Sequence, residues 1–207
     1  MIVGVTGHRP NRLKDAEMSA LRASARSVLT ALAEAAPGEA HRVVSPLAEG
    51  SDRILAEEAA ALGWELYSPL PFSRADYEKD FKTAASKREF DELLSQAARV
   101  HELGGKRDTR SGRESAYTAV GRVVLDVSEV LVAIWDGEGE HGEGGTAQVV
   151  REARERGLPA IWIPSTPPHV PVLLAPTGTP RLPAEKLAAI AARFPKRPAA
   201  ATEDRPQ

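Results

Sequence analysis

The sequence predicts an α/β fold, with a Rossmann-like, doubly wound and mostly parallel sheet of about six strands and helices on both faces. Short β-branched or apolar segments alternate with longer segments in which apolar residues recur at helical spacing. The segment VLVAIW at 130–135 is continuously apolar, as expected for a central parallel strand that helices cover on both faces. Because parallel strands need crossover connections, this alternation favours right-handed strand–helix–strand units.

Six strands are expected along the chain, at 2–6, 42–45, 64–68, 99–103, 130–135 and 158–163. Helices are predicted between them, at 18–32, 51–62, 73–96, 114–127 and 146–156. Ser51 is the expected N-cap of the second helix, and Gly63 is expected to end it. Met18, Leu62 and Val127 are assigned to apolar helix faces, with Phe81 and Phe90 as core anchors.

The predicted Rossmannoid domain covers 1–164, and 165–207 is a proline-rich C-terminal appendage. Within the appendage only 184–194 keeps a helical pattern, so we expect one short helix there. The chain of 207 residues is long enough for one self-sufficient core and too short for a second full domain.

The composition excludes several kinds of chemistry. The absence of cysteine excludes disulfides, thiolate metal sites and cysteine nucleophiles. With 27 basic and 29 acidic side chains the net charge is −2, which lacks the footprint of a general nucleic-acid binder. No apolar run reaches the length of about 20 residues that crosses a bilayer, so we expect no membrane association and a cytoplasmic location.

No metal or cofactor site is expected. The five histidines are scattered, without paired spacing on a common helix face. The sequence also lacks a G-x-S-x-G nucleophile elbow and a phosphate loop of the G-x-x-x-x-G-K type. Classical nucleoside triphosphatase chemistry is therefore disfavoured.

The loops that follow the strands are the expected ligand site, since ligands of open parallel sheets bind beyond the carboxyl ends of the strands. One such loop begins at Asp136 and ends in Gly144, Gly145 and Thr146, directly before a helix. Glycines let backbone amides approach a ligand, and the first turn of a helix favours an anion. The alternative is a flexible turn without a ligand.

Two further loops carry candidate ligand groups. Gly7 ends the first strand, and His8 and Arg9 offer a donor and a fixed positive charge for phosphate, unless His8 packs inside and Arg9 makes a surface ion pair. In the second loop Glu49 and Asp52 could accept hydrogen bonds from ribose hydroxyls, although helix capping also explains these residues.

Gly50 and Ser51 complete this second candidate loop. In the basic, glycine-containing segment 104–113, which is predicted to be a loop, Arg113 is the candidate ligand contact. Tyr117, on the following helix, is interpreted as a core residue.

Four motifs in this order resemble those of the SLOG superfamily: VTGHRP at 5–10, AEGSD at 48–52, LPF at 70–72, and IWDG followed by GGTA between 134 and 147. That superfamily joins DprA-like (Smf) proteins, Lonely Guy proteins and nucleotide-sensing Rossmannoid domains. The resemblance implies a pocket for nucleotides or nucleotide derivatives, with Gly144, Gly145 and Thr146 on the phosphate, and it makes a homodimer plausible.

The resemblance to Lonely Guy enzymes has one departure. Their motif P-G-G-x-G-T-x-x-E carries a glutamate needed for hydrolysis, and here the position three after Thr146 is Val149. Valine cannot ionise, so a phosphoribohydrolase would need a carboxylate from another loop, with Glu49, Asp52 and Asp136 as candidates.

The leading hypothesis is therefore a protein that binds or senses a nucleotide or nucleotide-derived phosphate ligand. A nucleoside monophosphate phosphoribohydrolase and a structural or partner-binding domain without a ligand are the alternatives.

Overall fold

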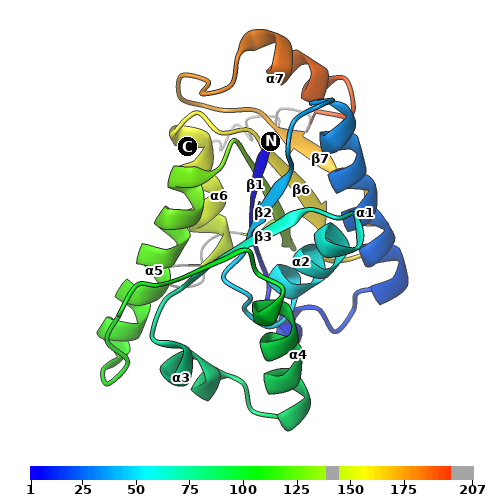
Figure 1. Ribbon diagram of the computed structural model, residues 1–207. Helices are drawn as coiled ribbons and strands as arrows, with labels where there is room; N and C mark the ends of the chain where they lie inside the picture. The colour runs from blue at the N-terminus through cyan, green and yellow to red at the C-terminus, as the bar shows by residue number, and fades with distance from the viewer. Residues whose placement is uncertain (139–144, 197–207) are drawn as a thin grey trace, which may run out of the picture.

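The computed structural model describes residues 1–138 and 145–196, which form a seven-stranded sheet with helices on both faces (Figure 1). The strand order is β4-β3-β2-β1-β5-β6-β7. The strands are β1 (Ile2–Gly7), β2 (Arg42–Val44), β3 (Glu65–Leu70), β4 (Arg99–Glu102), β5 (Val130–Trp135), β6 (Ala160–Pro164) and β7 (Val172–Leu174). The first six strands pair in parallel, which confirms the predicted Rossmann-like fold class.

The strand that the sequence did not predict is β7, which pairs antiparallel with β6. Its three residues lie in the proline-rich segment, too short for a periodic pattern to stand out. Every residue of β5 is buried, as its continuous apolar sequence predicts, and the strand lies between β1 and β6.

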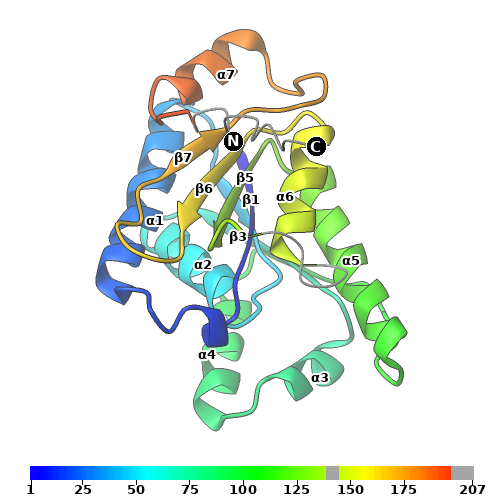
Figure 2. The ribbon, with the colours of Figure 1, turned by 180° about the vertical axis from the view of Figure 1, so that it is seen from behind.

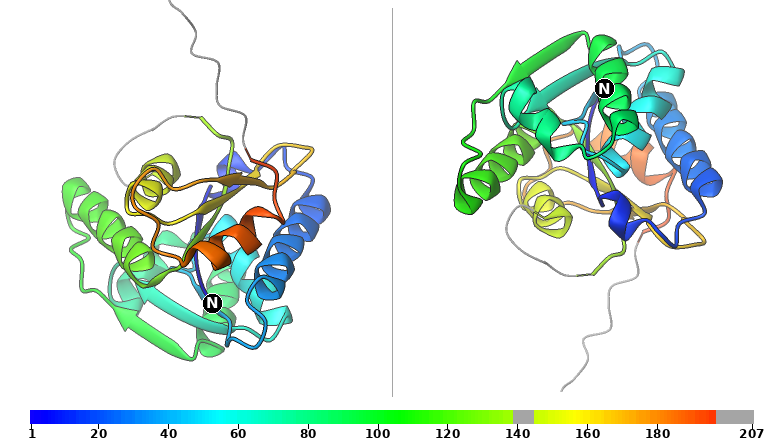
Figure 3. Two further views of the ribbon diagram at one scale, coloured as in Figure 1. Left: turned by 90° about the horizontal axis from the view of Figure 1, so that it is seen from above. Right: turned by 90° about the horizontal axis from the view of Figure 1, so that it is seen from below.

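Helices α1 (Met18–Glu34), α2 (Ser51–Ala61) and α4 (Ala84–Ser95) cover one face of the sheet. Helices α5 (Arg110–Val127) and α6 (Thr146–Glu155) cover the other face, as the end-on views in Figure 3 show. None of the helices in the described part of the chain is long and apolar enough to cross a membrane.

The segment predicted as one helix at 73–96 is divided. A short helix α3 (Arg74–Tyr77) continues into a 3-10 turn, and α4 begins after Thr83, whose hydroxyl accepts a hydrogen bond of 3.0 Å from the amide of Ser86. This cap restarts the helix in a new direction. Phe81 and Phe90 are buried, as predicted.

Helix ends differ from the prediction. Met18, Leu62 and Val127 are exposed, because each lies at the end of its helix, where the core no longer covers it. The segment expected as a loop to residue 113 ends earlier, since Thr109 caps α5 by accepting a hydrogen bond from the amide of Gly112.

Ser51 is not the N-cap of α2. That position belongs to Gly50, whose φ of +93° is favourable for glycine. The hydroxyl of Ser51 instead donates to the carbonyl oxygen of His8, at 3.0 Å.

Residues 165–196 pack on the domain. Helix α7 (Ala184–Ala191) lies beside the N-terminus, at the end of the molecule opposite α3 (Figures 1 and 2). Ile190 is fully buried in the same core cluster as β1 and β5 residues. The amine of Lys186 lies 2.8 Å from carboxylate oxygens of both Glu39 and Glu129, which holds α7 over the amino ends of the strands.

Candidate functional site

The carboxyl ends of β1 and β5 meet where the strand order reverses. From β1 the chain moves outward through β2 and β3 to β4, then returns through α5 to pair β5 on the other side of β1. The loops after β1 and β5 therefore diverge to opposite faces, and this divergence leaves a crevice. A cavity of about 420 Å³ opens there.

The cavity brings together residues from three loops that the sequence singled out. Its lining includes Gly7, His8, Arg9, Asp52, Gly145 and Thr146. The turn after Thr6 and the turn before Thr146 thus border one shared cavity, as the sequence predicts. Gly144 lies outside the described residues.

Five of the candidate residues do not line this cavity. Glu49 accepts a hydrogen bond from the hydroxyl of Ser86, which directs it toward α4. Arg113 donates to the backbone oxygen of Arg107 at 2.9 Å. Asp136 pairs with His8, and Gly50 and Ser51 form the junction between α2 and the loop after β1.

The glycine at position 7 is required by packing. A Cβ at Gly7 would lie 2.5 Å from the backbone oxygen of Ile134 and would overlap the side chain of Ser51. Because Gly7 has no Cβ, the first turn of α2 can pack directly on the end of β1. This contact fixes the position of Asp52, one residue further along α2.

His8 belongs to a paired polar group at one side of the cavity. Its Nε2 lies 2.9 Å from Oδ2 of Asp136, which also accepts a hydrogen bond from Arg12. Burial outweighs the effect of Asp136 and lowers the pKa of His8 below its usual value. Burial of Asp136 opposes its ionisation, but the amide of Glu138, His8 and Arg12 together hold its pKa below the usual range.

Arg9 is placed differently, because its guanidinium makes no hydrogen bond to any described residue. The group lies 5.9 Å above the ring of Tyr117 and 3.9 Å from a carboxylate oxygen of Asp80. Asp80 is held in turn by the hydroxyl of Tyr117, which donates to it, and by Arg107 at 2.6 Å. The surroundings orient Arg9 while most of its donors stay available.

Asp52 presents a buried carboxyl group to the cavity. Among the described residues its only hydrogen-bond donor is the amide of Ala48, at 3.4 Å, and no cation lies within ion-pair distance. Burial raises the pKa of Asp52 to about 7, partly offset by the charge of Arg9 and by that amide. The side chain is only 7% exposed, so this carboxyl is desolvated and nearly unpaired.

The start of α6 also lines the cavity. Gly145 precedes the helix, and Thr146 and Ala147 supply the first-turn amides. These amides and the helix dipole favour an anion. Between the polar ends, Val120 and Gly121 of α5 and Val149 of α6 provide an apolar wall.

Arg12 and Tyr77 line the cavity and were not singled out from the sequence. Tyr117 packs against the core, as the sequence analysis expects, and it also lines the cavity. Arg12 lies five residues after Gly7, close to the end of the first strand, and this closeness is the one sequence signal that could have identified Arg12 as a cavity residue. Nothing in the sequence near Tyr77 indicates that this side chain borders the same cavity as the end of β1.

The described residues form no metal centre. In the ranges 1–138 and 145–196 no group of three or more histidine, aspartate or glutamate side chains is arranged to hold a metal ion.

No family model matches the chain, and no curated protein matches its sequence. The fold is similar to that of DNA processing protein A (DprA) from Streptococcus pneumoniae, with a TM-score of 0.51 and 17% sequence identity. The match covers 78% of this chain and 50% of that chain, so this chain spans about half the length of the DprA structure. The likeness concerns the fold.

Proposed function

We propose that this protein binds a nucleotide or nucleotide-derived small molecule, as a sensor or carrier, in the cavity between β1 and β5. The observation that carries the proposal is the guanidinium of Arg9, which borders the cavity without a hydrogen-bond partner among the described residues. Arginine pairs with phosphate through two parallel hydrogen bonds, and the amides at the start of α6 offer a second set of donors.

The size and lining of the cavity support a ligand of nucleotide class. Its volume of about 420 Å³ lies within the range of small-molecule sites. The wall of Val120, Gly121 and Val149 suits a flat apolar body such as a nucleobase, while the polar ends suit phosphate and sugar. A purely structural role leaves the unused hydrogen-bonding capacity of Arg9 and Asp52 unexplained.

Isothermal titration calorimetry with nucleoside monophosphates, NAD, ADP-ribose and cyclic nucleotides tests this proposal. At least one compound is expected to bind the wild-type protein, and Arg9→Gln is expected to weaken it by tenfold or more, about 1.4 kcal/mol. Arg88→Gln is the matched control, because Arg88 is exposed on α4 away from the cavity. No heat with any compound, or equal loss in both variants, would contradict the proposal.

A phosphoribohydrolase is the second candidate, and one observation favours it. Of the three carboxylates considered for hydrolysis, Asp52 alone lines the cavity, and its raised pKa of about 7 suits proton transfer near neutral pH. This candidate predicts base release from a nucleoside monophosphate, detected by chromatography and abolished in Asp52→Asn. Absence of base release by the wild type from all four ribonucleoside monophosphates would exclude it.

A further inference from the structure

We propose that Asp52 and Tyr77 form a subsite for the sugar hydroxyls of the ligand, so that the protein selects ribonucleotides over their deoxy counterparts. This inference rests on the proposed function, since it names the part of the nucleotide that one end of the same cavity recognises.

The carboxyl of Asp52 has unused hydrogen-bonding capacity. The side chain is more than nine-tenths buried and lines the cavity, and its only donor among the described residues is the long contact from the amide of Ala48. A desolvated carboxyl in this state gains from a hydroxyl that donates to it.

The hydroxyl of Tyr77 is the second unpaired group at this end. Tyr77 is 1% exposed and lines the cavity, yet its hydroxyl makes no hydrogen bond to the described residues. Its ring contacts Phe81 and Phe90 edge-on, with centroids 5.2 Å and 5.7 Å away, so the phenol is held in place. A phenol can both donate and accept, which suits a pair of adjacent hydroxyls.

The groups around Asp52 favour a neutral partner for its carboxyl. A phosphate placed directly against this carboxyl is repelled whenever it is ionised, and the nearby guanidinium of Arg9 repels a cationic group. A neutral group with O–H donors satisfies Asp52 and Tyr77 without either conflict.

The sugar is the part of a nucleotide that would reach this subsite. Arg9 is the charged group with the largest effect on the pKa of Asp52, and both Asp52 and Tyr77 affect the pKa of Arg9. All three line the cavity, so they share one end of it. In a nucleoside monophosphate the sugar is joined directly to the phosphate, whereas the base lies beyond it. A phosphate on Arg9 therefore brings the sugar to Asp52 and Tyr77, and the base extends along the apolar wall.

Calorimetric titration of the wild-type protein with each ribonucleoside monophosphate and its 2′-deoxy and 3′-deoxy counterparts tests the inference. The ribonucleotide that binds best is expected to exceed at least one deoxy counterpart by about tenfold or more. Discrimination below about twofold against both counterparts would overturn the sugar subsite and leave the proposed function intact. No binding by any compound would overturn both.

Tyr77→Phe and Asp52→Asn provide the second readout. Each is expected to reduce the discrimination to about twofold or less while the affinity for the deoxy compound stays unchanged. A merely structural role would weaken both compounds equally, which would overturn the inference. Tyr77→Phe keeps the ring packing, so it decides the matter if Asp52→Asn does not fold, and Asp15→Asn on the exposed surface is the control.

Discussion

The polar side chains at the cavity differ in how far their neighbours satisfy them. His8, Asp136 and Arg12 pair with one another, so little remains for a ligand. Arg9 and Asp52 face the same space with most of their hydrogen-bonding capacity unused. Buried polar groups in folded proteins are normally paired, and unpaired groups that border a cavity are therefore the best indication of a ligand.

The raised pKa of Asp52 predicts a pH dependence of stability. The folded value of about 7 lies above the usual 3.8, so the folded protein retains a proton that the unfolded chain releases. The stabilisation from Asp52 is thus fully present below about pH 4 and is lost as pH rises through 7, by an amount on the order of 4 kcal/mol. In urea unfolding at pH 4.5 and 7.5, the wild type is expected to lose more stability than Asp52→Asn.

Asp15→Asn serves as the control for this pH series, because Asp15 is exposed. Its free energy of unfolding should follow that of the wild type. Parallel pH profiles of wild type and Asp52→Asn would show that Asp52 ionises normally in the folded protein.

Gly7→Ala is expected to destabilise the fold strongly. The added Cβ meets the backbone oxygen of Ile134 and the side chain of Ser51, and the backbone of a central strand cannot move away easily. We expect a loss of about 2 kcal/mol or more in chemical denaturation. Gly121→Ala is the control, since its Cβ meets only Val149 at 3.4 Å and alanine favours a helix interior; equal stability of Gly7→Ala and wild type would contradict the packing account.

At the scale of elements, the alternating strands and helices were predicted from the sequence. Features that depend on contacts between residues distant in the chain were missed. Strand β5 and helix α2 were predictable from apolar runs and glycine ends. The division of 73–96 into α3 and α4 was not, because Phe81 packs beneath the guanidinium of Arg53, 4.4 Å from its ring, a contact that no local pattern records. The place of Tyr77 at the cavity follows from the same division.

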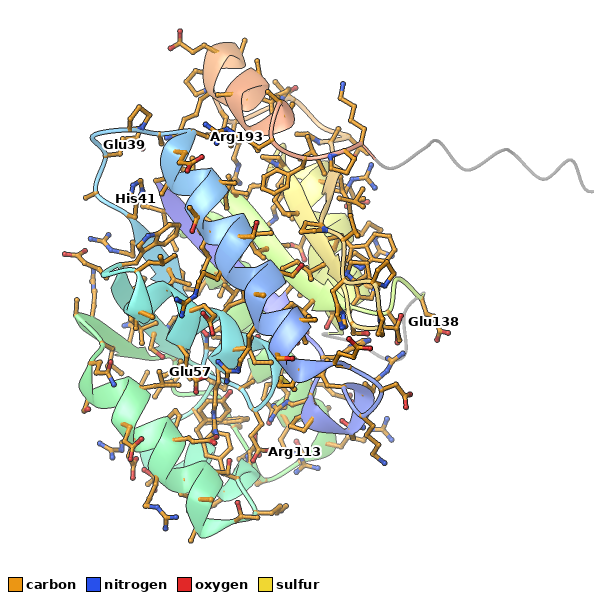
Figure 4. All side chains as sticks on the ribbon, turned by 90° about the vertical axis from the view of Figure 1, so that its right-hand side faces the viewer. Glu39, His41, Glu57, Arg113, Glu138 and Arg193 are labelled. Atoms are coloured by element: carbon orange, nitrogen blue, oxygen red, sulfur yellow. The ribbon has the colours of Figure 1, made fainter. Side chains whose placement is uncertain are left out.

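The helix in the C-terminal segment was predictable from its apolar spacing. Its packing on the domain was not, because Lys186 of this helix pairs with Glu39 and Glu129, which lie far from it in the sequence. Lys186 and the N-terminal amine together lower the pKa of Glu39 to about 2. Figure 4 shows Glu39 and Arg193 at this end of the molecule, away from Glu138 near the cavity.

Ile190→Ala tests whether α7 is an integral part of the fold. Ile190 is fully buried against the core, so its truncation is expected to cost 2 to 5 kcal/mol, roughly the range for a large-to-small core change. Leu187→Ala, at a half-buried position on the same helix, should cost less. Denaturation that is equally insensitive to both changes would show that α7 contributes little to global stability.

For the whole molecule, the central feature is the reversal of strand order between β1 and β5. This reversal places the Arg9 loop and the start of α6 on the same cavity, although 135 residues lie between Arg9 and Gly145 in the sequence. The sequence predicted this meeting from the general behaviour of parallel sheets, and the predicted ligand contacts and homodimer stay predictions. The base, the number of phosphates and the partner chain leave no such trace in a single sequence.

A crystal structure of the protein with a nucleoside monophosphate that calorimetry identifies would test the central claim most directly. The account predicts that the phosphate lies in the cavity between β1 and β5, with its oxygens within hydrogen-bond distance of the Arg9 guanidinium or the amides of Thr146 and Ala147. A nucleotide bound elsewhere, with this cavity unoccupied, would contradict it.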